Sequence, residues 1–126
     1  MTLCLSESLQ KNLYLNLSKL HMHFIYVLTL TDHYQDPAHW DEDTSAKLDM
    51  HWNYLVDLHA RDVMQFVGRT SYAPGDKDLF GIAVFSAADE AEATRIMQAD
   101  PAIVHGIMTA RLHPFNLSLI AGKEPV

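Results

Sequence analysis

His51 is the residue whose type and position in this sequence most clearly suggest chemistry. The chain has eight histidines in 126 residues, so the count alone selects none of them. However, Leu48, His51, Leu55 and Leu58 recur at the spacing of one helical face. A histidine on a buried stripe must satisfy both ring nitrogens away from bulk water, so His51 needs a polar partner.

Asp100 is the partner that the predicted topology supplies. Two predicted helices, at residues 44–61 and from about residue 86 to 99, lie antiparallel on one face of a sheet. His51 is then about seven residues, or roughly 10 Å, from the helix end that adjoins Asp100. A carboxylate that holds an imidazole fixes its tautomer and raises its basicity, as general-base catalysis requires. A catalytic pair and a structural hydrogen bond in the core both fit this pattern.

Arg69 and His39 are weaker candidates, for binding an anionic group of a substrate. Arg69 stands at the end of a predicted strand and His39 in a long polar loop, so ordinary surface roles are the alternative. The sequence has no His-Glu-x-x-His run, cysteine cluster or Gly-rich phosphate loop, and it therefore predicts no metal site. Ser71 and Ser86 have no base near them in the sequence, which argues against a catalytic serine.

The elements that must position these residues follow the order β-α-β-β-α-β. Strands are predicted at residues 24–30, 63–72 and 79–86 and within 107–119, from β-branched and aromatic runs. Ser86 with Asp89 resembles a capping box that opens the second helix, and Asp100-Pro101 ends that helix. The order predicts a ferredoxin-like α+β fold, an antiparallel sheet with two helices on one face.

The other face of this sheet also needs a cover. The runs at residues 24–30 and 81–85 are apolar on both faces, although two helices can cover one face only. A homodimer packed through its sheet faces is the solution we expect, with residues 1–21 as the alternative cover. Those residues form an N-terminal extension of unknown role, ahead of one domain at residues 22–121 and a tail at 122–126.

The composition excludes several classes of partner. The net charge of −7 argues against nucleic acid and against an anionic membrane surface. No stretch reaches the roughly 20 apolar residues of a membrane helix. Cys4 is the one cysteine, which is consistent with a reducing, cytoplasmic location. The acidic clusters at 41–43 and 89–90 suit helix starts, where carboxylates interact favourably with the positive end of the helix dipole.

Around these positions the sequence resembles the YCII-related (YciI-like) family. The matching motifs are a helix with His and an aromatic-Leu pair, a strand ending in glycine, an apolar strand with an early glycine, a Glu/Ala-rich helix, Asp-Pro followed by glycine, and a Pro-aromatic step. They are His51-Trp52-Asn53-Tyr54-Leu55, Phe66-Val67-Gly68, Gly81, Asp89-Glu90-Ala91-Glu92-Ala93, Asp100-Pro101 with Gly106, and Pro114-Phe115. Arg69, Ala102 and Asp62 depart from the family, which often has proline, an aromatic residue and glycine there.

The resemblance implies a dimeric α-β barrel whose active-site His-Asp pair carries over to His51 and Asp100. Members with assigned chemistry look like dehydrochlorinases or muconolactone-type lyases and isomerases, which act without a metal or organic cofactor. We therefore expect a cofactor-free lyase or isomerase for a small organic substrate. A non-catalytic ligand-binding or accessory module with a structural pair is the alternative, and a phosphorylated histidine is a third hypothesis.

Overall fold

Strand β1 (Met22–Leu30) lies inside the sheet in the computed structural model, which describes residues 22–125. β3 (Gly81–Ala87) and β4 (Met108–Pro114) flank β1, and β2 (Met64–Arg69) pairs with β3 at one edge. All pairs are antiparallel, and the strand order is β2-β3-β1-β4. β1 is rich in β-branched and aromatic residues, which suit a pleated and largely buried strand.

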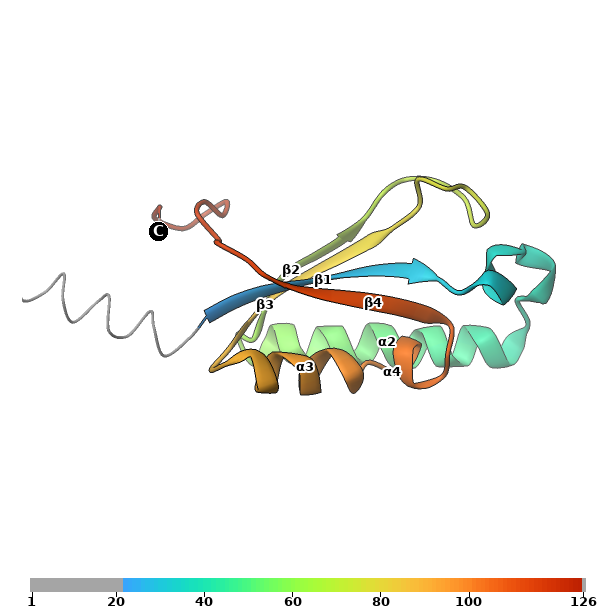
Figure 1. Cartoon of the computed structure of the whole chain (residues 1–126), viewed down its shortest axis with the longest axis horizontal. Coiled ribbons are helices and arrows are strands. Elements are labelled where there is room, and N and C mark those ends of the chain that lie inside the picture. The colour runs from blue at the N-terminus through green and yellow to red at the C-terminus, as the bar shows by residue number, and fades with distance from the viewer. Residues whose placement is uncertain (1–21, 126) are drawn as a thin grey trace, which may run out of the picture.

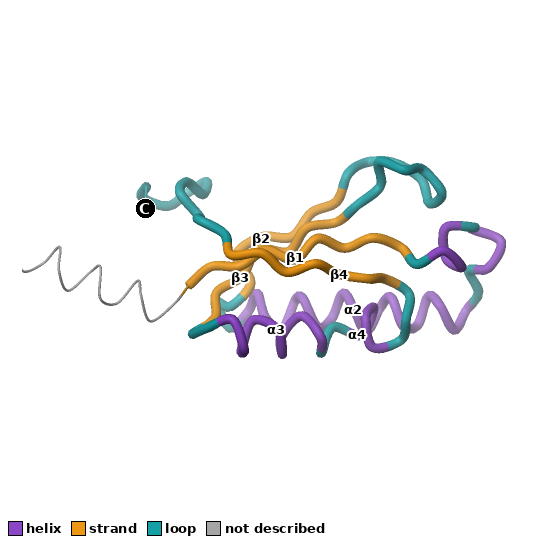
Figure 2. The backbone as a smooth tube through the Cα atoms, in the orientation of Figure 1, coloured by secondary structure: helices purple, strands orange, loops and turns teal. Residues whose placement is uncertain are grey.

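The helices lie together on one side of this sheet (Figures 1 and 2). After β1 the chain forms two short 3-10 helices, η1 (Asp32–Gln35) and η2 (Pro37–His39), and then the long helix α2 (Glu42–Ala60). α3 (Glu90–Gln98) and the one-turn helix α4 (Pro101–Val104) follow β3. The predicted α+β fold, with ferredoxin-like βαββαβ order and helices on one face, is confirmed.

Helix α2 is capped at both ends by hydrogen bonds, one to the Asp41 side chain and one between backbone groups. The Asp41 side chain accepts a hydrogen bond from the Thr44 N–H at 2.9 Å, so the acidic cluster caps the helix as expected. At the other end Asp62 has a positive φ of 61°, and the Val63 N–H donates to the Leu58 carbonyl at 2.9 Å. Glycine usually takes such a position. Aspartate tolerates it better than most residues, so the turn survives without the family glycine.

The structure corrects one predicted cap and the end of one predicted strand. Ser86 belongs to β3, and Asp89 itself is the N-cap of α3, with its side chain accepting from the Glu92 N–H at 2.8 Å. The capping-box prediction at Ser86 was therefore wrong. β2 ends at Arg69, because its partner β3 begins only at Gly81 in the opposite direction. β4 ends at Pro114, consistent with the lack of a backbone donor in proline.

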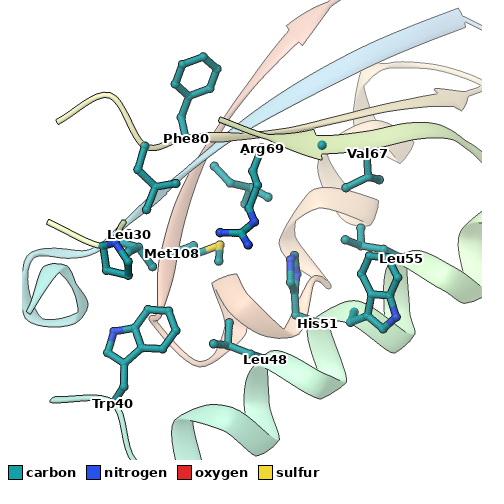
Figure 3. A pocket seen from close by; sticks show the side chains of 15 residues that line it. Leu30, Trp40, Leu48, His51, Leu55, Val67, Arg69, Phe80 and Met108 are labelled. Atoms are coloured by element: carbon teal, nitrogen blue, oxygen red, sulfur yellow. The ribbon is translucent and has the colours of Figure 1, made fainter. Parts of the chain in front are cut away.

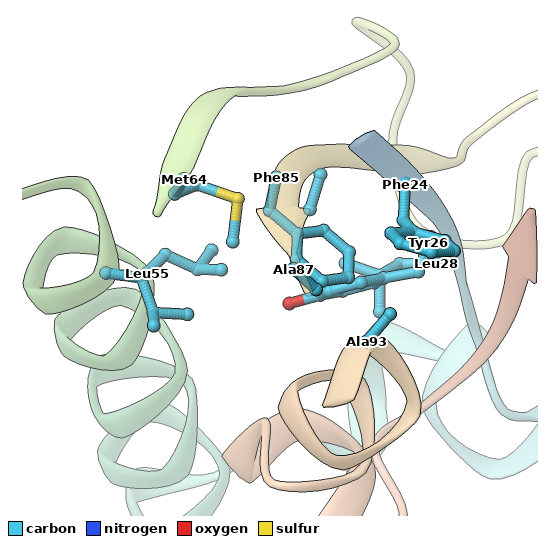
Figure 4. Packing of buried hydrophobic residues seen from close by; sticks show 10 residues of the cluster. Phe24, Tyr26, Leu28, Leu55, Met64, Phe85, Ala87 and Ala93 are labelled. Carbon is cyan, nitrogen blue, oxygen red and sulfur yellow. The ribbon is translucent and has the colours of Figure 1, made fainter. Parts of the chain in front are cut away.

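The core lies between the sheet and the helices (Figure 4). Phe24, Tyr26 and Phe85 are fully buried there, and the Tyr26 and Phe85 rings meet edge to face with centroids 5.5 Å apart. Leu55 and Leu58 of α2 are buried in the same cluster. The predicted leucine stripe thus faces the sheet and orients α2 about its own axis.

The opposite face of the sheet carries the alternate residues of the same strands. Ile25 and Val27 of β1 and Ile82 of β3 are half-buried there, and Val84 is fully buried. The apolar character predicted for both faces is therefore present in the central strands. The predicted extension at residues 1–21 falls outside the described part of the chain. None of the helices in residues 22–125 is both long enough and apolar enough to cross a membrane.

Candidate active site

His51 and Asp100 are hydrogen-bonded in the structure. His51 Nδ1 lies 2.6 Å from Asp100 Oδ1, across a sequence separation of 49 residues. The Asp100 side chain is fully buried, and the His51 side chain is 14% exposed. Because α2 and α3 run antiparallel, the first half of α2 lies beside the junction of α3 and α4, as the topology predicted.

Asp100 takes its position from the proline that follows it. Its backbone is extended (φ −62°, ψ 123°), which is the conformation that a following proline favours. Asp100 Oδ1 accepts a hydrogen bond from the Ala102 N–H at 2.9 Å, which makes Asp100 the N-cap of α4 with Pro101 at the first position. The same oxygen therefore caps a helix and faces His51.

Tyr26 is a third member of the site that the sequence analysis missed. Its hydroxyl donates to Asp100 Oδ2 at 2.9 Å, and the whole residue is buried. Burial, followed by the charge and hydrogen bond of Asp100, raises the pKa of Tyr26 far above its ordinary value, so the hydroxyl keeps its proton. A signal was available, because β1 alternation places Tyr26 on the core face between Phe24 and Leu28. A buried tyrosine hydroxyl there must find a partner.

The contact with Asp100 selects one tautomer of His51. An ionised carboxylate only accepts hydrogen bonds, so in that state Nδ1 carries the hydrogen that Asp100 Oδ1 receives. Nε2 of the neutral imidazole is then unprotonated and can accept a proton from another molecule. The carboxylate would compensate the positive charge of the imidazolium that results. This geometry can therefore support general-base chemistry.

His51 also lines a cavity of about 470 Å³ between α2 and the sheet (Figure 3). This volume is within the range of small-molecule sites. The wall is mostly apolar and comes from all four strands, from α2 and from the loops. Its apolar side chains are Leu28, Leu30, Trp40, Leu48, Trp52, Leu55, Val67, Pro74, Leu79, Phe80 and Met108.

Arg69 extends from β2 into this cavity (Figure 3). It pairs in register with Gly81, whose lack of a side chain leaves room beside it. Within residues 22–125, no carboxylate forms an ion pair with the Arg69 guanidinium. Arg69 and His51 are the ionisable residues of the cavity wall, so the cavity is suited to an anionic group.

His39 lies apart from the residues that line the cavity. Its Nδ1 is 2.6 Å from the His33 carbonyl oxygen, and its ring stacks on that of His33 with centroids 4.1 Å apart. The next residue, Trp40, does reach the cavity, and its Nε1 donates to the Tyr34 carbonyl at 2.8 Å. The position of His39 thus gives no support to its predicted contact with substrate. Trp40, which does line the cavity, was not predicted as a site residue.

The other titratable groups do not add a metal site. Among the residues that the structure describes, no three His, Cys, Asp or Glu side chains gather closely enough to hold a metal ion. His59, His105 and His113 are exposed. The chemistry that this site can offer is therefore that of an imidazole, a buried carboxylate, a tyrosine hydroxyl and a guanidinium.

A family model for the YCII-related domain matches residues 26–115 of the chain. The match begins within β1 and ends at the residue after β4, and it includes His51, Arg69 and Asp100. No curated protein matches the chain significantly.

Several solved structures are similar to this one, among them a dehydrochlorinase and an oxygenase. The 5-chloro-2-hydroxyhydroquinone dehydrochlorinase TftG of Burkholderia phenoliruptrix, in complex with 2,5-dihydroxybenzoquinone, is 17% identical, with a TM-score of 0.56 over 75% of this chain and 94% of TftG. SnoaB, a cofactor-independent oxygenase of Streptomyces nogalater, is 13% identical, with a TM-score of 0.40 over 82% of this chain and 98% of SnoaB. The similarity to TftG agrees with the α+β fold described above.

Proposed function

Because this chain belongs to the YCII-related family, we propose that it is a cofactor-free lyase or isomerase that moves a proton on a small organic substrate. The observation that carries the proposal is the 2.6 Å contact between His51 and Asp100 at the wall of a ligand-sized cavity. A histidine held in one tautomer beside open space has the geometry of a general base.

In this mechanism His51 Nε2 removes a proton from a carbon next to a carbonyl or a carbon–halogen bond. The electron pair of the broken C–H bond forms a new double bond. In an elimination, a halide ion leaves from the neighbouring carbon; in an isomerisation, the imidazolium returns the proton to a different carbon. Asp100 holds the ring and stabilises the imidazolium, while the Tyr26 hydroxyl holds Asp100 from its other side.

Arg69 has a separate role, which is to bind an anionic oxygen of the substrate. Its guanidinium lies at the cavity without an acidic partner among residues 22–125. An enolate or phenolate oxygen that gains charge as the proton leaves would be stabilised by such a group. Position and charge thus support the assignment of Arg69 as the substrate-binding cation.

The second candidate function is a non-catalytic ligand-binding module, and one observation favours it. The Asp100 carboxylate accepts hydrogen bonds from His51 Nδ1, the Tyr26 hydroxyl and the Ala102 N–H, and is fully buried. Such a group stabilises a fold whether or not chemistry follows. Under this hypothesis the cavity binds a ligand, and His51 serves mainly as a donor to a buried charge.

Turnover separates the two functions. The fold shared with TftG makes 5-chloro-2-hydroxyhydroquinone the first compound to test, with chloride release as the readout. Other small carbonyl compounds can be incubated in D2O, where proton abstraction replaces a carbon-bound hydrogen with deuterium. Wild-type protein should release chloride or exchange hydrogen, and His51→Gln should lose the activity while staying folded. Ligand binding with no exchange or elimination in wild type would instead favour the non-catalytic module.

We also propose that the chain forms a homodimer through the open face of the sheet. The half-buried Ile25, Val27 and Ile82 on that face support it, because apolar strands usually pack against a second layer. Val27→Asp should convert the dimer to a monomer in sedimentation velocity. Asn53→Asp, which adds the same charge at an exposed position on α2, should not. A wild-type protein that sediments as a monomer would rule out this dimer.

A further inference from the structure

A second hollow adjoins the cavity at His51. It has a volume of about 420 Å³ and lies between α2 and the edge strand β2. Trp52, Leu55 and Val67 line both hollows, so the two lie side by side along α2. Figure 3 places Leu55 and Val67 at the opposite end of the first cavity from Trp40. The second hollow therefore extends the candidate site beyond that end.

Three apolar residues that line the second hollow are exposed. Trp52 is 60% exposed, Val56 is 45% exposed and Val67 is 39% exposed. Trp52 and Val56 are four residues apart on α2, so they are neighbours on one side of the helix. The hollow ends near His59 and Gln65, which are polar. An apolar surface thus extends from the site along α2 and ends at a polar boundary formed by His59 and Gln65.

The two hollows differ in the charged residues that line them. The first contains Arg69, whose guanidinium has no acidic partner among residues 22–125, whereas the second contains no Asp, Glu, Lys or Arg. A ligand that fills both would need an anionic group at one end and an apolar body at the other. From His51 to His59 the helix rises about 12 Å, which sets the approximate length of the apolar part.

We propose that the second hollow is a subsite for the apolar tail of a monoanionic ligand whose acidic head group binds Arg69 beside His51. This inference rests on the proposed function for the location of the head group, but it concerns binding alone. Trp52 and Val56 contact the tail, and the polar boundary at His59 limits its length.

The test is a calorimetric titration of the full chain with straight-chain carboxylates, which measures the affinity for each one. Butanoate, hexanoate, octanoate and decanoate are used below their micelle concentrations. Affinity should rise with each added methylene by about two-fold, since full burial of a methylene corresponds to roughly four-fold and the groove leaves one side open. The rise should hold across the series, because the roughly 12 Å from His51 to His59 accommodates the decanoate chain.

Matched variants locate the tail and the head. Val56→Asp should leave butanoate binding unchanged and abolish the gain with chain length. Asn53→Asp carries the same added charge on an exposed position of α2 outside both hollows, and should keep the gain. Arg69→Gln should weaken all four carboxylates by a similar factor. Circular dichroism checks that each variant is folded.

Several results would overturn the subsite. Affinity that is independent of chain length, or a gain that Val56→Asp leaves intact, would place the tail elsewhere. Failure of every carboxylate to bind would refute the proposed ligand class. If Val56→Asp changes the sedimenting mass and wild type shows no chain-length gain, the hollow is a contact between copies of the chain. Loss of turnover in His51→Gln leaves these titrations unaffected, so the two proposals can fail separately.

Discussion

Replacing Tyr26 with phenylalanine removes one oxygen atom from the most buried part of the candidate site. The Tyr26 hydroxyl donates to Asp100 Oδ2 at 2.9 Å, and both side chains are inaccessible to water. In the variant that carboxylate oxygen loses its donor, and no solvent is available to replace it. The Ala102 N–H and His51 Nδ1 still contact Asp100 Oδ1, so helix α4 keeps its cap.

The expected loss of stability follows from the charge of the acceptor. Hydrogen bonds to charged groups contribute about 1.5–3 kcal/mol, against about 1 kcal/mol for neutral pairs. Tyr54→Phe is a matched control, because it removes a hydroxyl that donates to the neutral Ile96 carbonyl at 2.7 Å and leaves the hydrogen bonds of Asp100 in place. We expect Tyr26→Phe to lower the free energy of unfolding by about 2–3 kcal/mol and Tyr54→Phe by about 1 kcal/mol.

The same substitution should change the dependence of stability on alkaline pH. Burial, followed by Asp100, raises the pKa of Tyr26 above its ordinary value near 10. Below pH 10 the tyrosine is neutral in both folded and unfolded states, and its contribution to stability is complete. Above pH 10 the unfolded chain loses the proton first, so stability falls by about 1.4 kcal/mol by pH 11. Tyr26→Phe should lack this loss.

Urea unfolding, followed by circular dichroism at pH 7 and at pH 11, measures both quantities. Equal destabilisation by the two phenylalanine substitutions at pH 7 would refute the claim that Tyr26 supports a buried carboxylate. Parallel curves of stability against pH in wild type and Tyr26→Phe would refute the pKa argument. Burial, Asp100 and Asp57 also raise the pKa of Tyr54, with Arg61 opposing them, so Tyr54→Phe should remove part of the alkaline loss as well.

Other substitutions probe the remaining parts of the site. Asp100→Asn keeps an acceptor for the helix cap but loses the charge, so turnover should fall by about 10²–10⁴-fold, with a loss of stability of about 1–3 kcal/mol in urea unfolding. Arg69→Gln should weaken butanoate binding by about 10–100-fold in calorimetry, the equivalent of one charged hydrogen bond. Arg111 pairs in register with Val27 on the far face of the sheet, so Arg111→Gln should leave butanoate binding unchanged. His39→Ala should alter neither ligand affinity nor turnover, and a loss of either would restore His39 to the site.

Periodicity and chain order, together with the family resemblance, predicted the fold and the meeting of two distant residues. The leucine stripe oriented α2, and antiparallel helices brought His51 to Asp100. Both inferences depend on regular geometry, which a local sequence pattern encodes directly. The departure at Asp62 did not mislead the fold prediction, because aspartate also adopts the required positive φ.

The parts that were missed depend on which side chains converge in space. Alternation along β1 indicates that the Tyr26 hydroxyl is buried and needs a partner, but no local pattern identifies Asp100 as that partner. His39 and Trp40 are adjacent in the sequence, yet the backbone between η2 and α2 brings only Trp40 to the cavity. The Ser86 cap failed for a similar reason, since pairing with β1 extends β3 to Ala87, past the expected helix start.

The double use of one carboxylate has a consequence for how such a site changes in evolution. Asp100 would be retained by the requirement to fold, because it caps α4 and receives the Tyr26 hydroxyl even in a protein that performs no reaction. His51 and Arg69 line the cavity, and folding depends less on them than on Asp100. A relative without the proposed reaction should therefore differ first at His51 and Arg69, and keep the aspartate and the proline that follows it.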